Sequence, residues 1–289
     1  RGGMFGEALD RYRQAREADP QSTDALAGEA RSLVHLGRHV EALPLALQLL
    51  DRVPNDVEAH VLTARAAMAF GDLERAIDTL EAARRLAPLR AEIAQLTGDA
   101  MRAAGDVERA MEAYRHALAL DPALLEPRLE LAQLLAMRGE MDRAEMELEA
   151  VLSHDPGREE AVLHLASLQR TNGRAAETIE RLISLLQQNP YHLDALASLG
   201  ESLFLASRRH DAVRAFARVL RFDADHVAAL YFEGVLLAEA HRYEEAMERW
   251  LRVQALEPAS EYARRARRDT RTALDLRHIF TPGRREGAA

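Results

Sequence analysis

The sequence predicts an all-α protein, a solenoid of stacked helix–turn–helix units with one further helix at its C-terminal end. Three observations support this fold class. Prolines recur at one constant interval, small residues recur in fixed columns of the same register, and apolar residues between the columns follow the spacing of a helix face. In such a solenoid each unit packs only on its neighbours, so no single core has to organise all 289 residues.

Prolines set the register of the units. Proline lacks an amide hydrogen and disfavours helix in the residue before it, so each is expected just after a second helix. Pro258 follows the regular series at twice the spacing, and Pro44 lies outside it, early in a second helix that is therefore expected to be bent or shortened. The regular series is Pro20, Pro54, Pro88, Pro122, Pro156 and Pro190.

Three columns of small residues follow the same register. The first holds Ala with Thr178 as the exception, the second holds Ala or Gly, and both are expected where two helices cross too closely for a large side chain. The third holds Gly from Gly3 to Gly173, where a helix ends in the left-handed conformation. Ser207 and His241 replace this Gly in the last two units, so their turns should cost more or take another geometry. Crossing points are expected at Ala76, Ala110 and Ala144.

In these columns the sequence resembles the tetratricopeptide repeat family, whose unit of about 34 residues is a helix–turn–helix with small residues at these positions and a closing proline. The resemblance implies a right-handed α-solenoid with seven units over residues 23–260. Residues 1–22 then supply the second helix of a truncated unit, residues 261–281 a C-terminal capping helix and residues 282–289 a tail. Arg268 stands in a small-residue column, so the last segment should not form an eighth unit.

The capping helix has recognisable ends. Ser260 is the expected N-cap and Pro282 the expected stop. Five Arg between positions 264 and 271 should point mostly outward. The face toward the seventh unit should hold Tyr262, Ala263, Ala266, Thr270, Ala273 and Leu274, with Leu276, Ile279 and Phe280 closing the end.

Composition restricts the class of function. The chain has no Cys, which excludes disulfides, thiolate metal sites and cysteine nucleophiles. It has no phosphate loop, dinucleotide fingerprint, zinc motif or nucleophile elbow, and no apolar run long enough to span a membrane. We therefore expect no enzymatic activity, no cofactor and no metal.

Charge and terminal sequence bear on ligand and compartment. The net charge of the chain is −9. Residues 259–289 carry +4, so the other residues together carry −13, and this acidic body argues against nucleic acid as the main ligand. All 38 basic residues are Arg, as in a GC-rich bacterial genome. No signal peptide is recognisable, so we expect the cytoplasm, with the periplasm as the alternative if a targeting segment lies upstream.

The family resemblance implies that the first helices line a concave groove that holds a peptide or a helix of a partner protein. The Lys and Asn of a carboxylate clamp and the ladder of Asn are both absent, although Arg31 and Arg65 suit an acidic ligand. Some apolar candidates could instead face the core between units. The candidate groove residues are Arg31, Arg65, Arg102, Leu129, Leu163, Arg170, Phe204, Tyr231, Phe232 and Val235.

We therefore predict a protein-interaction scaffold or adaptor. The alternative is the recruitment arm of a larger enzyme, or of a secretion or assembly machine, whose catalytic or membrane part lies outside this chain. A column of acids at the start of the first helices is either part of the binding face or a complement to the helix dipoles. These acids are Asp24, Glu58, Glu92, Glu126, Glu160 and Asp194.

Overall fold

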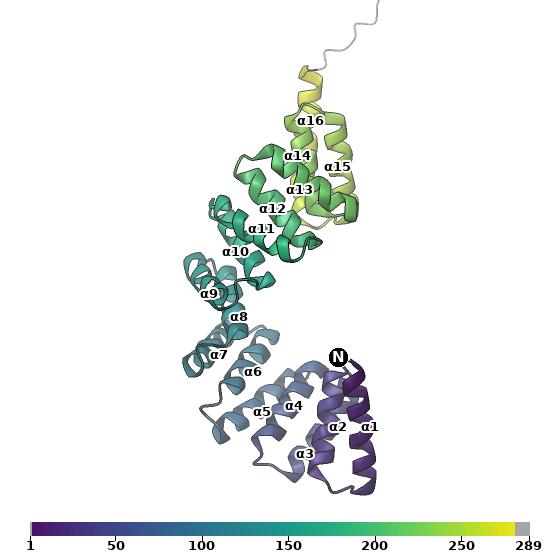
Figure 1. The fold of residues 1–289 in the computed structure, drawn as a ribbon, viewed down its shortest axis with the longest axis vertical. Coiled ribbons are helices and arrows are strands. Elements are labelled where there is room, and N and C mark those ends of the chain that lie inside the picture. Colours follow the sequence, from purple (N-terminus) through teal and green to yellow (C-terminus); the bar gives the residue numbers. More distant parts are fainter. Residues whose placement is uncertain (1, 281–289) are drawn as a thin grey trace, which may run out of the picture. The chain divides into compact units, whose positions relative to one another are not determined.

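The computed structural model describes residues 2–280, and helices account for all the regular structure within them (Figure 1). Most helices come in pairs that recur with the interval of the prolines, a first helix followed by a second. The elements are α1 (Gly2–Ala18), α2 (Thr23–His35), α3 (His39–Arg52), α4 (Val57–Phe70), α5 (Leu73–Leu86), α6 (Ala91–Ala103), α7 (Val107–Leu120), α8 (Leu125–Met137), α9 (Met141–His154), α10 (Glu159–Thr171), the 3-10 helix η1 (Ala175–Thr178), α11 (Ile179–Gln188), α12 (Leu193–Leu205), α13 (Arg209–Phe222), α14 (Val227–Glu239), α15 (Tyr243–Leu256) and α16 (Glu261–Phe280). The fold is an all-α solenoid, as the sequence predicts.

The contacts between helices divide the chain into two compact parts, each holding several repeats. These parts, residues 1–147 and 148–289, are called the first and the second unit from here on. In the first unit the first helices α2, α4 and α6 lie side by side, and each also packs on the second helix that follows it. In the second unit α10, α12 and α14 are neighbours in the same way, and α16 packs on both α14 and α15 (Figure 1). First helices therefore form a continuous face within each unit, and the repeat period alone did not predict the division.

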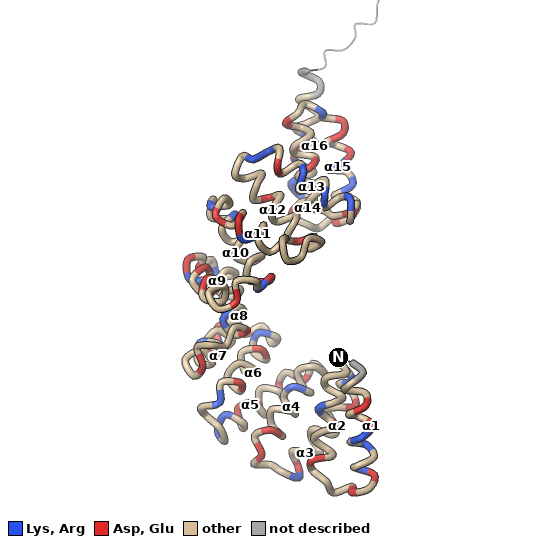
Figure 2. Tube along the Cα trace, in the orientation of Figure 1, with Lys and Arg blue, Asp and Glu red and all other residues tan. Residues whose placement is uncertain are grey.

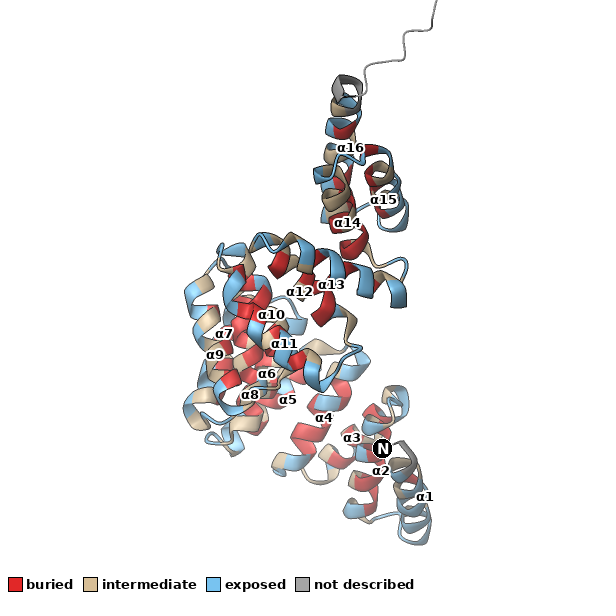
Figure 3. Cartoon of the chain, turned by 45° about the horizontal axis from the view of Figure 1, so that its top comes forward, coloured by how far each residue is buried: buried red, intermediate tan, exposed pale blue. Residues whose placement is uncertain are grey.

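Every helix pair has buried residues (Figure 3), and among them large side chains are matched with small ones. Gly98 lies under the ring of Tyr114, and a Cβ added there would come within 2.5 Å of that ring. Where a leucine replaces the aromatic residue, an alanine replaces the glycine. The three Ala predicted at close crossings are fully buried. The aromatic pairs are Gly98 with Tyr114, Gly200 with Phe216 and Gly234 with Trp250, and the aliphatic pairs within each unit are Ala64 with Leu80 and Ala166 with Leu182.

The turns inside the helix pairs keep one geometry throughout. The glycines of the third column, from Gly37 to Gly173, have φ between 73° and 92°. Ser207 and His241 adopt φ of 60° and 58°, so the last two turns keep the left-handed conformation. Of the two predicted outcomes, higher cost is therefore the one that applies, because side chains with a Cβ resist this conformation. Gly3 is different: it lies inside α1 and ends no helix.

Two second helices depart from the regular pattern. Pro44 lies within α3, yet α3 is 14 residues long, the same length as α5 and α7, so the predicted shortening is wrong and the alternative, a bend, stays a prediction. The proline removes one amide near the N-terminal end, and buried neighbours such as Leu43 and Leu49 hold the helix in place. The 3-10 segment η1 ends at Thr178, whose buried hydroxyl lies 3.3 Å from the hydroxyl of Ser202. Here the α-helix begins only at Ile179.

Buried charge fixes α1 to the helix pair that follows it. Glu29 on α2 is buried, and its carboxylate lies 3.1 Å from Nε of Arg13 and 2.6 Å from Nε of Arg16. The ring of Tyr12 lies directly over Gly28. These contacts attach α1 directly to α2.

The C-terminal helix α16 begins as predicted. The hydroxyl of Ser260 accepts a hydrogen bond of 3.1 Å from the amide of Ala263, which confirms Ser260 as the N-cap. Ala263, Ala266 and Ala273 are buried, whereas the Arg side chains between 264 and 271 are exposed. Leu274 is also exposed, so its assignment to the packed face is wrong. The side chains of Ile279 and Phe280, the stop at Pro282 and the tail lie outside the described residues.

Candidate functional site

The first-helix face of the first unit, formed by α2, α4, α6 and α8, carries ion pairs that join one first helix to the next. Arg65 on α4 lies 2.9 Å from Glu92 on α6, and Arg90 bonds both Glu92 and Glu58, the latter at 2.6 Å. Burial acts to raise the pKa of Glu92, but hydrogen bonds from Arg65 and Arg90 hold that pKa below its usual value. Two acids of the first-turn column thus belong to a ladder of charges on this face.

Arg102 sits at a denser polar cluster on the same face. Its Nε lies 3.1 Å from Glu130 on α8. Beside it, the phenol of Tyr114 donates a 2.8 Å hydrogen bond to Asp99. Burial raises the pKa of Asp99 despite this bond, and burial together with the charge of Asp99 raises the pKa of Tyr114. Arg102 is therefore engaged within the protein.

Arg31 differs from the other predicted arginines of this face. It occupies the column of Arg65, and the counterpart of Glu92 in its own unit is Glu58, which bonds to Arg90 instead. Arg31 is exposed, and no ion pair to it is found within residues 2–280. Its guanidinium is therefore open to an external carboxylate.

Two aliphatic candidates are less accessible than predicted. Leu129 is only 2% exposed, so the expectation that it lines an open groove is wrong. Its side chain is part of the buried core, the alternative that the sequence left open for the apolar candidates. Leu163 is half-buried and keeps part of its surface on the first-helix face of the second unit.

In the second unit, Arg170 is held by the next first helix. Its Nη1 donates a 2.6 Å hydrogen bond to Ser198, and its Nε lies 3.2 Å from Glu201. The phenol of Tyr262 on α16 donates a further 2.9 Å hydrogen bond to Glu201. Residues of α10, α12 and α16 therefore meet at one carboxylate.

The aromatic candidates form a cluster that α16 covers. Tyr231 and Phe232 are 6% and 7% exposed, so the prediction that they line an open groove is wrong. The ring of Tyr262 lies 5.5 Å from that of Tyr231 and 6.1 Å from that of Phe232. Phe204 is half-buried, with its ring 5.3 Å from Phe232 and the guanidinium of Arg209 4.0 Å above it. The C-terminal helix takes the place that the sequence assigned to a ligand.

Val235 is half-buried and lines a cavity between α14, α15 and α16. Neither this cavity nor the partners Tyr262, Asp269 and Glu201 were singled out as functional from the sequence. The signal that marks the cavity is a change of residue size within one column, from Phe204 to Ala238. Such a change carries meaning only when the neighbouring helix is known.

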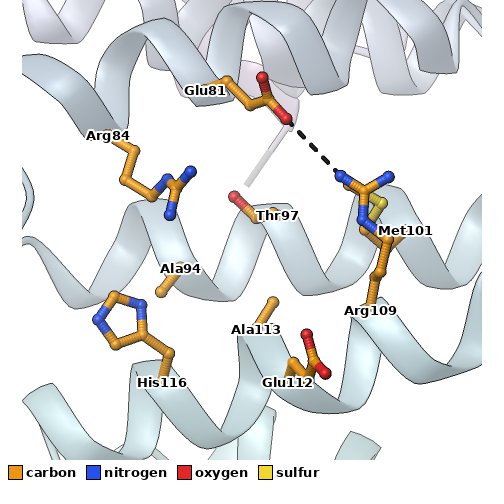
Figure 4. A pocket seen from close by; sticks show the side chains of 9 residues that line it. All are labelled: Glu81, Arg84, Ala94, Thr97, Met101, Arg109, Glu112, Ala113 and His116. Atoms are coloured by element: carbon orange, nitrogen blue, oxygen red, sulfur yellow. Dashed lines mark ion pairs between the residues drawn. The ribbon is translucent and has the colours of Figure 1, made fainter.

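The second-helix side of the first unit has a hollow of about 420 Å³ between α5 and α7, with α6 as its floor (Figure 4). Arg84 and His116 flank one end, and Arg109 lies 3.6 Å from Glu81 at the other. A matching hollow lies one repeat further along the chain, between α7 and α9. Both signs of charge alternate around the hollow, so no one class of ligand is favoured.

Arg and acidic residues are interspersed along the helices (Figure 2). Within the described residues 2–280, no group of His, Asp and Glu is arranged to hold a metal ion. In the same part of the chain, no helix combines the length and the apolar character that a membrane crossing needs.

The paired helices and matched columns define a helical-repeat solenoid, a class whose extended surfaces bind other proteins. Two sequence families described as tetratricopeptide repeat match the chain, one over residues 33–99 and 101–168, the other over residues 1–57 and 198–263. The chain therefore belongs to the tetratricopeptide repeat family. Proteins of this family generally act as non-catalytic interaction scaffolds.

Solved structures show the same fold at low sequence identity. The C-terminal part of a tetratricopeptide repeat protein from Cytophaga hutchinsonii matches with a TM-score of 0.65 and 13% identity, covering 82% of this chain and 97% of the other. A tetratricopeptide repeat protein from Parabacteroides merdae matches with a TM-score of 0.61 and 15% identity, covering 88% and 99%.

The APC/C hetero-tetramer Cut9-Hcn1 matches with a TM-score of 0.62 and 15% identity over 93% of this chain. This chain spans about half of that one, 52% of its length. No curated protein matches the sequence. The likeness to solved structures thus concerns the fold.

Proposed function

We propose that the chain is a protein-interaction scaffold that holds an acidic segment of a partner protein on the first-helix face of its first unit. The observation that carries this proposal is the open guanidinium of Arg31. In the same column Arg65 meets a carboxylate of the next helix at 2.9 Å, whereas the equivalent carboxylate of Glu58 is bonded to Arg90. A partner carboxylate next to Arg31 would complete the ladder.

The neighbouring arginines mark a path for such a segment across successive first helices. Arg65 and Arg102 follow Arg31 on successive first helices, and each is exposed although it already pairs with a glutamate. An exposed pair is easily exchanged, because its net free energy is only about 0–1 kcal/mol. Acidic side chains of a bound segment can therefore compete for these guanidinium groups in turn.

The corresponding face of the second unit supports a structural role. Arg170 is largely buried among Ser198 and Glu201, and α16 covers Tyr231. These groups are engaged with the protein itself, so we place the ligand on the first unit.

A fluorescent peptide of alternating Glu and Ala, titrated into the full chain, tests the proposal. Arg31→Ala should weaken binding about two- to fivefold, the range of an exposed ion pair. Arg84→Ala is the matched control, since Arg84 is an exposed arginine on α5 of the same unit. A peptide of alternating Gln and Ala, which carries no negative charge, should bind neither the unmodified chain nor the two variants. Equal weakening by the two variants would mean general attraction between charges and would refute the site.

A further inference from the structure

The cavity at the C-terminal end of the second unit has an aromatic floor. Its volume is about 350 Å³, it is open to the surface, and residues of α14, α15 and α16 line it. Trp250 and Tyr243 line it and are only 2% and 8% exposed, while the small side chain of Ala238 forms part of the wall. Ligand pockets in proteins begin at about 300 Å³, so this cavity has the size of a small binding site.

The repeat register explains why the space is empty. In the preceding helix pair, α12 and α13, the equivalent region is filled by three rings. Phe204 and Phe216 each lie 5.3 Å from Phe232, the second in a stacked arrangement. These three rings belong to columns that continue one repeat later, in α14, α15 and α16.

In the last pair two of the three rings are missing. Ala238 stands in the column of Phe204, Ala266 in that of Phe232 and Trp250 in that of Phe216. The indole of Trp250 is larger than the ring of Phe216, but the difference is smaller than the two benzyl groups that are missing at Ala238 and Ala266. A space therefore remains beside Trp250. The preceding pair therefore shows what kind of side chain fits there.

It also shows which charge accompanies that side chain. The guanidinium of Arg209 lies 4.0 Å above the ring of Phe204, and its Nε lies 2.8 Å from the carboxylate of Glu239. Glu239 is at the same time a lining residue of the cavity, and Asp269 is another. Both lining carboxylates already pair with an arginine, Glu239 with Arg209 and Asp269 with Arg268 at 3.0 Å. Among the residues that the structure describes, no positively charged one lines the cavity itself, so its lining favours a cation over an anion.

We propose that this cavity is a docking site for an aromatic side chain of a partner protein, with an arginine or lysine adjacent to it in the same segment. The ring would pack against Trp250 and Tyr243, at the column position that Phe204 fills in the preceding pair. The cation would lie over the ring and near Glu239. The site lies in the second unit and involves none of the arginines proposed to hold an acidic segment.

Trp250 is the only tryptophan of the chain, so tryptophan fluorescence reports on the surroundings of this one cavity-lining side chain. The probe is the blocked dipeptide amide acetyl-Phe-Arg-amide, added to the full-length protein. We expect a saturable change in emission with a Kd on the order of 1 mM, as for a small fragment. Acetyl-Phe-Glu-amide should bind at least about threefold more weakly because of the rim carboxylates. Acetyl-Ala-Arg-amide should produce no saturable change.

Ala238→Phe rebuilds the ring of the preceding pair and should abolish the response to acetyl-Phe-Arg-amide. Ala255→Phe is the matched control, because Ala255 is exposed on α15 and should keep the response. A second measurement needs no variant. In methyl NMR spectra of the unmodified protein, the probe should shift Val235 and Leu276, which line the cavity.

A response of Ala238→Phe equal to that of the unmodified protein would overturn the proposal. So would an equal response to acetyl-Ala-Arg-amide, or methyl shifts confined to other helices. Because the NMR measurement stands on the native sequence, a folding defect in Ala238→Phe would leave the proposal open to refutation.

Discussion

The phenol of Tyr231 on α14 donates a hydrogen bond of 2.8 Å to the carboxylate of Asp269 on α16. Burial, with the hydrogen bond to Asp269, raises the pKa of Tyr231, so the phenol remains a donor throughout the neutral range. The bond joins α14 to α16 beside the packed rings of Tyr231, Phe232 and Tyr262. A face that the sequence assigned to a ligand is thus closed by the chain itself.

Removing this hydroxyl should destabilise the second unit. Tyr231→Phe keeps the ring but leaves Asp269 without its buried donor, and we expect a loss of about 1–2 kcal/mol in the free energy of unfolding. Urea unfolding followed by the fluorescence of Trp250 measures it. Tyr191→Phe, at an exposed tyrosine of the same unit, should change the midpoint little. The same small change in both variants would contradict a structural role for the bond.

The match of large with small residues can be measured by a double-mutant cycle. Gly200→Ala places a Cβ within 2.6 Å of the ring of Phe216 and should cost about 1–3 kcal/mol by overpacking. Phe216→Leu alone leaves a space and should cost a similar amount. Together the two changes recreate the Ala166 and Leu182 pair found in the preceding helices.

The double variant should therefore lose less stability than the sum of the single variants, with a coupling of about 1 kcal/mol or more. The measurement is chemical unfolding of all four proteins under one set of conditions. Strict additivity would show that the two positions do not constrain each other.

The period and the small columns predicted the fold because they record a repeated backbone geometry. A small residue at nearly every crossing and a left-handed residue at every turn inside a helix pair leave few other arrangements for the helices. The same logic reached Ser260 as an N-cap. The columns did not predict the 3-10 segment before Ile179. Its only mark in them is Thr178, which replaces the alanine of the first column.

The exposure of the candidate binding residues was harder to predict. A column fixes which way a side chain points, but not what lies opposite it. Phe232 and Tyr231 stand at positions that the sequence predicts to face a groove, and the ring of Tyr262 on α16 packs on both of them. Arg31 and Arg65 share a column, yet only one finds a carboxylate, because Arg90 takes Glu58. Contacts between neighbouring repeats, and between the last repeat and α16, decide these outcomes.

The left-handed turn at Ser207 should be improvable. Its φ of 60° is costly for any residue with a Cβ, and glycine fills this position in five earlier turns. Ser207→Gly should raise the free energy of unfolding by about 0.5–1 kcal/mol, the strain relieved less the extra chain entropy of glycine. Gly71→Ala, the reverse change at φ of 92°, should be destabilising. Thermal unfolding of both variants measures the two changes in stability. A lower melting temperature for Ser207→Gly would contradict the inference that Ser207 is strained in this turn.

Asp99 should make stability depend on pH in an unusual direction. Burial raises its pKa in the folded state, so the ionised carboxylate disfavours folding at neutral pH. Asp99→Asn keeps an acceptor for Tyr114 and removes the buried charge, and should be at least as stable as the unmodified protein at pH 7. Its advantage should fade as the pH falls through the raised folded-state pKa toward the unfolded value, because the native carboxyl then takes up its proton on folding.

Asp72 supplies the opposite case. A hydrogen bond from Arg75 lowers its pKa in the folded state, so its ionised form favours folding. Asp72→Asn should therefore lose stability at pH 7, and the loss should disappear as the pH falls through the lowered pKa. Urea midpoints across an acid-to-neutral series measure both variants. The same sign for the two differences at pH 7 would refute the assignment of Asp99.

Deletion of the C-terminal helix should expose the aromatic cluster it covers. A chain that stops after Pro258 loses Tyr262 and Asp269, and with them the cover over Tyr231 and Phe232. Each large apolar side chain brought back into water costs about 1.5–3 kcal/mol, so the second unit should lose at least about 3 kcal/mol. Unfolding followed at Trp250 measures this loss, and binding of a hydrophobic dye reports the uncovered surface.

Tyr262→Ala in the full-length chain separates the cover from the rest of the helix. It removes the ring over Tyr231 and the hydrogen bond to Glu201 while α16 keeps its buried alanines. We expect an intermediate loss of stability, with α16 still helical by circular dichroism. If the truncated protein melts like the full chain and binds no more dye, α16 contributes nothing to the core. The aromatic cluster would then be accessible in solution, and Tyr231 and Phe232 would return as candidates for ligand binding.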